Sequence, residues 1–122
     1  MPKILVIDDD PNIREMLQEV LSDAGYAVDV ASDGAEGLLM VKNSPPDLIV
    51  TDIIMPEQDG VGVMLHIAKD YPNIKTIAIS GGGRISPESY LYMAEKFGAA
   101  KTFMKPFDIN EFLAAVEEVL NK

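Results

Sequence analysis

Hydrophobic residues follow two different spacings that take turns along the chain. Residues 4–7 form a continuous run of β-branched residues and leucine, as is typical of a strand buried on both faces, and further strands are predicted over residues 48–50, 74–79 and 102–104. A fifth segment, residues 26–31, alternates more and less apolar side chains, which indicates a partly buried strand. The pattern therefore predicts five β-strands.

A segment with helical spacing follows each predicted strand. The first helix begins at Pro11, directly after the capping residue Asp10, and stops before Gly25. Further helices are predicted over residues 33–41 with a capping box, 60–70, 86–97 and from 109 onward, after the cap Asp108. The apolar face of the last helix consists of Phe112, Leu113, Val116, Val119 and Leu120.

Five strand–helix units with short connections predict an α/β fold. Right-handed crossovers give a five-stranded parallel sheet with five helices distributed over both faces. The length of 122 residues fits one domain, residues 1–122. Because ligands of such sheets bind beyond the carboxyl ends of the strands, functional residues are expected there.

The amino-acid composition limits the classes of partner that the protein is expected to bind. Twenty acidic residues against ten basic ones give a net charge of −10, which disfavours direct binding to nucleic acid or to an anionic membrane. The absence of cysteine excludes disulfides and thiolate metal sites. No apolar run approaches the roughly 20 residues of a membrane span, so we expect a soluble, cytoplasmic domain.

Three carboxylates are expected to converge at the carboxyl edge of the sheet. Asp8 and Asp9 follow the first strand, and Asp52 follows the third, which should be its neighbour. Two carboxylates at about 5 Å repel by roughly 3 kcal/mol at an effective dielectric constant of 20. Either one of them stays protonated or a hard cation neutralises them, and a site made only of oxygen favours Mg²⁺, with Mn²⁺ as the alternative.

Lys105 and Ser80 complete this site. Lys105 follows the fifth strand, and the tight turn at Pro106 favours a cis bond before the proline. Ser80, at the end of the fourth strand, adds a hydroxyl between the lysine and the carboxylates. Carboxylates, a cation, a hydroxyl and a lysine together suit phosphoryl transfer onto a carboxylate.

The same residues resemble the receiver domain of bacterial response regulators. The resemblance covers essentially the whole chain and rests on the run 4–10, Asp52-Ile53-Ile54-Met55-Pro56, Asp59-Gly60, Ser80, Gly98-Ala99 and Lys105-Pro106-Phe107. It implies a flavodoxin-like strand order 2-1-3-4-5.

The resemblance also implies a role for each site residue. Asp52 would be the phosphoacceptor, Asp9 would bind Mg²⁺ directly and Asp8 through water, and the Ile54 carbonyl would be a further ligand. Ser80 and Lys105 would hold the phosphoryl group and couple it to the surface formed by the fourth helix, fifth strand and fifth helix. The donor would be the phosphohistidine of a sensor kinase or phosphotransfer protein, and the acyl phosphate would slowly hydrolyse within the domain.

The expected partners follow from this role. They are the kinase and a downstream protein or output domain at that surface, and a phosphorylation-dependent dimer is compatible with it. No output domain is visible in the sequence, which fits either a separate regulator or a receiver cut from a longer chain.

Two positions depart from the family pattern. The switch position three residues before the lysine is usually aromatic and here is Thr102, while Phe103 should point to the opposite face of the sheet. The loop after Ser80 carries three successive glycines, which favour a hinge over a nucleotide-binding loop. We therefore expect a signal to pass through residues 81–90.

Other features have simpler interpretations. His66 begins a short match to histidine phosphotransfer motifs but is expected to be a solvent-facing helical residue. The predicted fourth helix carries more aromatic and aliphatic residues than one face can bury, which suits either a partner surface or a loosely amphipathic helix. Methionines within the elements are expected to fill the core: Met16, Met40, Met64, Met93 and Met104.

Two alternatives stay open for the function. A degenerate receiver would act only as a binding module, although the intact set of site residues argues against it. An aspartyl phosphatase of the haloacid dehalogenase type would need a threonine after the first strand and a cap domain, and the chain offers neither.

Overall fold

The computed structural model describes residues 1–53, 60–80, 92, 96 and 98–121. In chain order its elements are β1 Lys3–Ile7, α1 Pro11–Asp23, β2 Ala27–Ala31, α2 Gly34–Asn43, β3 Leu48–Asp52, α3 Gly60–Asp70, β4 Lys75–Ser80, β5 Lys101–Met104 and α5 Ile109–Leu120. Their ends lie within a residue or two of the predicted ones. The predicted helix over residues 86–97 and the glycine loop lie outside the described residues, apart from Tyr92 and Lys96, which are both helical.

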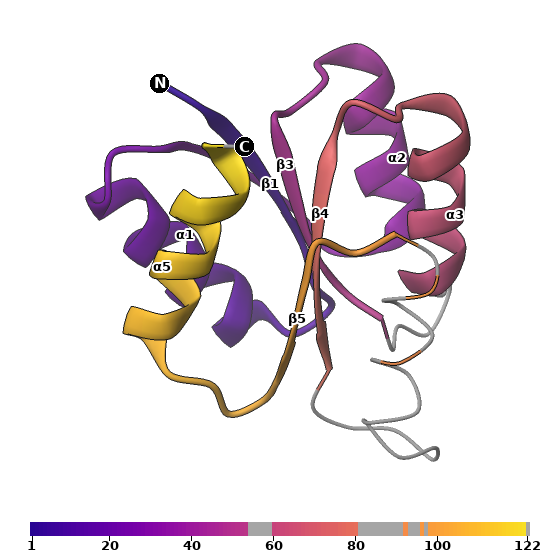
Figure 1. Ribbon diagram of the computed structural model, residues 1–122. Coiled ribbons are helices and arrows are strands. Elements are labelled where there is room, and N and C mark those ends of the chain that lie inside the picture. The colour runs from indigo at the N-terminus through magenta and orange to yellow at the C-terminus, as the bar shows by residue number, and fades with distance from the viewer. Residues whose placement is uncertain (54–59, 81–91, 93–95, 97, 122) are drawn as a thin grey trace.

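The five strands form one parallel sheet in the order β2-β1-β3-β4-β5. In Figure 1, α1 and α5 cover one face of this sheet, and α2 and α3 cover the other. The α/β class and the strand order are thus confirmed. This order makes β1 and β3 neighbours and places β5 at the edge beyond β4.

Strand alternation divides the interior into two cores. Ile4 and Val6 of β1 face the core that contains α1 and α5, whereas Leu5 and Ile7 face the core that contains α2 and α3. Phe103 of β5 packs on the first core, in edge contact with Phe112 of α5. The prediction that Phe103 does not share a face with Thr102 agrees with this placement.

Aspartates begin three of the described helices. Asp10, Asp33 and Asp108 are the N-caps of α1, α2 and α5, and each accepts a backbone N–H of the first turn. Such a cap stabilises a helix by about 1 kcal/mol. The predicted capping box of α2 is shifted, because the Glu36 carboxylate accepts the N–H of Ser32 at 2.7 Å.

Special backbone positions match the sequence in two respects. Gly25 and Gly98 have φ values of 100° and 108°, in the left-handed region that favours glycine, and Gly25 follows the end of α1 as predicted. The Lys105–Pro106 peptide bond is cis, as expected from the tight turn.

The prediction for methionines is wrong at one position. Met64 is buried, and Met16 and Met40 pack partly buried against the two cores. Met104, however, is 39% exposed, because it ends the edge strand β5. Met93 lies outside the described residues.

His66 faces solvent as predicted. Its Nε2 lies 3.2 Å from the Asp70 carboxylate, one turn further along α3, and both side chains are about half exposed. The histidine is therefore a surface residue of α3.

Gly37 allows α2 to approach the sheet closely. A Cβ atom at this position would lie 2.8 Å from Cγ1 of the buried Ile7, and closer still to Cδ1. We predict that Gly37→Ala lowers the free energy of unfolding by about 1–2 kcal/mol, because overpacking outweighs the gain in helix propensity of about 1 kcal/mol. Urea unfolding measures this change.

The Ile7→Val change supplies the control, because it removes Cδ1. The double variant should be more stable than the sum of the two single changes predicts. Additive effects, or a stabilising Gly37→Ala, would contradict the close contact.

Candidate functional site

Two buried carboxylates meet at the carboxyl edge of the sheet. Asp8 directly follows β1 and is fully buried, and Asp52 ends β3 and is 5% exposed. β1 and β3 are hydrogen-bonded neighbours, which brings the two side chains together. With the exposed Asp9, each contributes an oxygen atom such that all three lie within 4.8 Å of one another. The predicted convergence of these carboxylates is confirmed.

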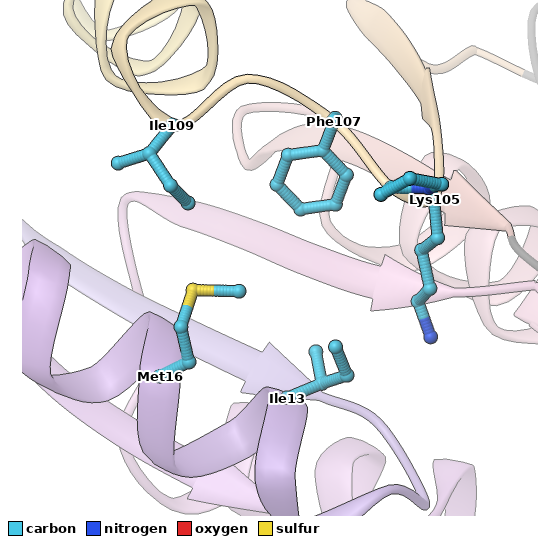
Figure 2. Close-up of a pocket in the computed structure, with 6 residues that line it drawn as sticks. Ile13, Met16, Lys105, Phe107 and Ile109 are labelled. Carbon is cyan, nitrogen blue, oxygen red and sulfur yellow. The ribbon is translucent and has the colours of Figure 1, made fainter.

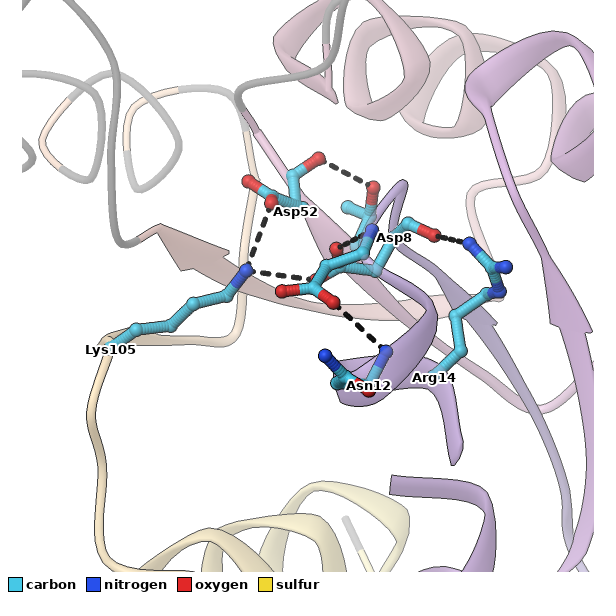
Figure 3. Close-up of polar contacts among 7 residues, drawn as sticks. Asp8, Asn12, Arg14, Asp52 and Lys105 are labelled. Atoms are coloured by element: carbon cyan, nitrogen blue, oxygen red, sulfur yellow. Dashed lines mark hydrogen bonds and ion pairs between the residues drawn. The ribbon is translucent and has the colours of Figure 1, made fainter. Parts of the chain in front are cut away.

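Lys105 reaches this cluster from the turn after β5, the edge strand beyond β4. Its Nζ lies 3.0 Å from Asp8 Oδ2 and 3.1 Å from Asp52 Oδ2, and Figure 3 shows the ammonium between the two side chains. The Lys105 backbone N–H donates to the Ser80 carbonyl at 2.7 Å, which holds the turn after β5 against the end of β4. The lysine predicted to complete the site is therefore in contact with it.

Ser80 and Thr102, the two predicted switch residues, lie on the neighbouring strands β4 and β5. The Ser80 side chain is fully buried, and its hydroxyl has no hydrogen-bond partner within the described part of the chain. The sequence predicts that this hydroxyl lies between the lysine and the carboxylates, but within the described residues it forms no hydrogen bond to either of them. Thr102 is half-buried in β5, opposite Ala78 of β4. Ile54 lies outside the described residues.

Two supporting residues escaped the sequence analysis. Nη1 of Arg14 donates to the Asp8 carbonyl at 2.8 Å, and Oγ1 of Thr51 donates to the Asp52 carbonyl at 3.0 Å. A signal for Arg14 was present in the sequence, since a cation near a helix N-terminus opposes the helix dipole and so indicates a tertiary role. For Thr51 no comparable signal exists, because threonine is common in strands.

Burial and charge shift two pKa values at this edge. The pKa of Asp8 is raised, first by burial and then by the neighbouring Asp52 carboxylate, although the Asp10 N–H and Lys105 oppose the shift. Burial lowers the pKa of Lys105, but the Asp52 and Asp8 carboxylates raise it by more, so its net pKa is above the ordinary value. The lysine therefore stays charged at neutral pH.

The residues present fit a hard divalent cation. Ionised Asp8, Asp9 and Asp52 with protonated Lys105 carry a net charge of −2, which one divalent cation compensates. All the candidate ligand atoms are oxygens, which suits Mg²⁺ and Mn²⁺. Asp9 is exposed, so the cluster opens to solvent on its side.

An apolar pocket lies beside Lys105. It has a volume of about 380 Å³ and is lined by Ile13, Met16, Lys105, Pro106, Phe107 and Ile109. Figure 2 shows Ile13 and Met16 of α1 facing Phe107 and Ile109 across it. The same lysine thus contacts the carboxylates and borders the pocket.

Among the described residues, no helix is both long and apolar enough to cross a bilayer.

The raised pKa of Asp8 predicts that its charge destabilises the metal-free protein. A carboxyl with a raised pKa contributes fully to stability below its unfolded pKa of about 3.9, and this contribution is lost as the pH rises through the folded pKa. In chelator at pH 7, Asp8→Asn should therefore raise the melting midpoint, by roughly 4 °C for each ~1 kcal/mol. The difference from the wild type should shrink as the pH falls toward about 4.

Asp9→Asn is the matched control, because Asp9 is exposed and its charge is not desolvated. It should change the midpoint less. An Asp8→Asn protein that melts below the wild type at pH 7 would contradict the charge argument.

Comparisons with known proteins agree with this arrangement. The family described as "Response regulator receiver domain" matches residues 4–117. The chain is 35% identical to the "DNA-binding dual master transcriptional regulator RpaA" of Synechocystis, over all of this chain and 50% of that protein. It is 33% identical to "Sporulation initiation phosphotransferase F" of Bacillus subtilis, over 97% of this chain and 93% of that one. The chain spans about half the length of most of the curated relatives it matches.

Solved structures show the same fold. A receiver domain from Clostridium thermocellum superposes with a TM-score of 0.90 at 29% identity, covering 99% of this chain and 95% of that one. A CheY-like receiver from Methanospirillum hungatei has a TM-score of 0.91 at 27% identity, over 99% and 94% of the two chains. Receivers of this kind are phospho-accepting domains of two-component systems, whose regulators partner with histidine kinases and output domains. With its family match, strand order and carboxylate edge, the chain belongs to the response regulator receiver family.

Proposed function

We propose that residues 1–122 form one receiver domain that accepts a phosphoryl group on Asp52 from the phosphohistidine of a sensor kinase or phosphotransfer protein. The observation that carries this proposal is the Lys105 ammonium, 3.0 Å from Asp8 and 3.1 Å from Asp52. A lysine bridging two buried carboxylates supplies the positive charge that a phosphoryl oxygen needs beside the nucleophile. A solely structural ion pair would need only one carboxylate.

The transfer exchanges one bond for another. An Asp52 carboxylate oxygen attacks phosphorus, the O–P bond forms, and the N–P bond to the donor imidazole breaks, with the electron pair leaving on nitrogen. An ionised carboxylate needs no general base. His66, the one histidine of the chain, lies exposed on α3 and takes no part.

Two groups are suited to bind the phosphoryl oxygens. Lys105 can exchange one of its carboxylate contacts for a phosphoryl oxygen, and the Ser80 hydroxyl, at the end of β4, has no hydrogen-bond partner among the described residues. A buried hydroxyl without a partner costs free energy, which a phosphoryl oxygen would recover. We assign the switch to Ser80 together with Thr102 on the neighbouring strand.

Asp8, Asp9 and Asp52 would hold Mg²⁺, with the Ile54 carbonyl as a further ligand implied by the family. The bound cation would offset the negative charge of carboxylate and phosphoryl group and align them. Slow hydrolysis of the acyl phosphate then resets the domain. The altered surface, made of the fourth helix, β5 and α5, would meet a downstream protein, an output domain or a second phosphorylated copy.

We further propose that the phosphodonor protein docks at the apolar pocket between α1 and the turn after β5. Lys105 borders this pocket and contacts Asp52, so a donor seated there would bring its phosphohistidine to the nucleophile. The walls are mostly apolar side chains, and burial of apolar surface is a main source of protein–protein affinity.

Phosphorylation is tested with Mg²⁺ and a small-molecule acyl phosphate. Intact mass spectrometry should show one added phosphoryl group on the wild type and none on Asp52→Asn, because only the carboxylate is the nucleophile. Asp23→Asn, an exposed carboxylate at the end of α1, is the matched control and should still be labelled. An unlabelled wild type would favour the degenerate binding module, and a labelled Asp52→Asn would move the acceptor elsewhere.

Docking is tested by comparing two donors. Met16→Gln places a polar amide in the pocket and should slow transfer from a phosphorylated histidine kinase about tenfold, the effect of losing roughly 1.4 kcal/mol of transition-state binding. Labelling by the small acyl phosphate should stay unchanged, because that donor needs no docking.

Leu39→Gln provides the control for a change of surface polarity. Leu39 is 59% exposed on α2, which covers the other face of the sheet. Equal slowing by both variants would argue against docking at the pocket.

A further inference from the structure

Arg14 occupies an unexpected place on α1. Only four residues after the N-cap Asp10, its cation opposes the dipole at the positive end of the helix. The side chain is half-buried, and Nη1 donates to the Asp8 carbonyl at 2.8 Å (Figure 3). Within the described part of the chain it forms no ion pair, and its side-chain hydrogen bond goes to a backbone carbonyl.

The bonded carbonyl belongs to the peptide group that joins Asp8 to Asp9. The following peptide group, which joins Asp9 to Asp10, is held as well, because the Asp10 N–H donates to Asp8 Oδ1 at 2.9 Å. Each peptide group is planar, so Asp9 has only its φ and ψ angles free between the two planes. Holding both planes therefore fixes the backbone of Asp9 and the direction of its Cα–Cβ bond.

Asp9 depends on this backbone support more than its neighbours do. Asp8 and Asp52 are buried and contact Lys105, whereas Asp9 is exposed, and no described group forms a hydrogen bond to its carboxylate. Its aim toward the other two carboxylates must come from the main chain. One of the two bonds that fix this main chain is made by Arg14.

We propose that Arg14 is a positioning residue that preorganises Asp9 for a divalent cation and so sets the affinity of the site for that cation. This inference rests on the metal site in the proposed function. Ligands held in place by outer partners bind metal more tightly, and loss of such a partner weakens affinity by about 10- to 100-fold.

Because Arg14 is positively charged, the direction of the change in metal affinity distinguishes a positioning role from a purely electrostatic one. A guanidinium near the carboxylates repels a divalent cation, so removing its charge alone would tighten binding. Removing its hydrogen bond would weaken binding by releasing Asp9. Only the positioning role predicts weaker binding when charge and bond are removed together.

Isothermal titration of the chelator-treated protein with MgCl₂ measures the affinity. Arg14→Met should raise the Kd about tenfold, and Arg14→Lys, which keeps the charge and one donor, should recover part of the loss. Gln18→Met, one turn further along α1 and exposed, is the matched control and should bind like the wild type. Equal or tighter binding by Arg14→Met overturns the proposal.

The metal-free protein provides a second readout. The backbone amide order parameter of Asp9, measured by ¹⁵N relaxation, should fall from about 0.85 toward 0.6 in Arg14→Met and stay unchanged in Gln18→Met. An unchanged order parameter also counts against the proposal. A wild type that binds no Mg²⁺ would remove the metal site itself, whereas a binding wild type with a normal Arg14→Met would remove only the role of Arg14.

Discussion

Two buried carboxylates that share one ammonium hold the functional edge of this protein together. Lys105 lies 97 residues from Asp8 and 53 from Asp52 in sequence, and it contacts both at about hydrogen-bond distance. The contact links the turn after the last strand to the ends of the two central ones. Without the lysine, two desolvated negative charges would face each other across neighbouring strands, which a fold does not tolerate without neutralisation.

One ammonium leaves the site with an excess of negative charge. Burial, together with the Asp52 charge, raises the pKa of Asp8, and the exposed Asp9 places a third carboxylate oxygen within 4.8 Å of the other two. In the proposed function, stability and activity therefore oppose each other here, because the charge that destabilises the metal-free edge is the charge that would attract a divalent cation. The strands β1, β3 and β4 are almost entirely buried, so the packing of both cores holds the strand ends that carry the site.

Support for the site comes from one side of the sheet. α1 provides the Asp10 cap, which fixes the start of the helix, and Arg14, which holds the main chain before Asp9. The turn after β5 provides Lys105, and these same two segments line the apolar pocket. In the proposed function, α1 and the turn after β5 would thus support the cation ligands and the docking face for the donor, whereas Asp52 itself ends β3, and α2 and α3 pack on the opposite core.

The amino-acid sequence determined the elements and their order, because those follow from local patterns. Such patterns include the period of two in Tyr26–Ala31 and the helix caps Asp10, Asp33 and Asp108. Each of them involves only a few neighbouring residues, so it is recognisable in the local sequence. The convergence of Asp8, Asp9 and Asp52 is predictable when the strands are parallel and the first and third are neighbours, because the carboxyl ends of parallel strands lie at one edge of the sheet. Strand order itself came from the family resemblance.

Long-range packing settled what no local pattern encodes. Side-chain conformations where distant segments meet decide three features: the contacts of Lys105 with both carboxylates, the bond from Arg14 to a backbone carbonyl and the burial of the Ser80 hydroxyl. Met104 became exposed because it ends β5 at the sheet edge, although methionine is an apolar residue that usually fills a core. The spacing of hydrophobic residues indicates which side chains favour the interior. Whether each of them is buried depends on the neighbouring elements that the complete fold packs against it.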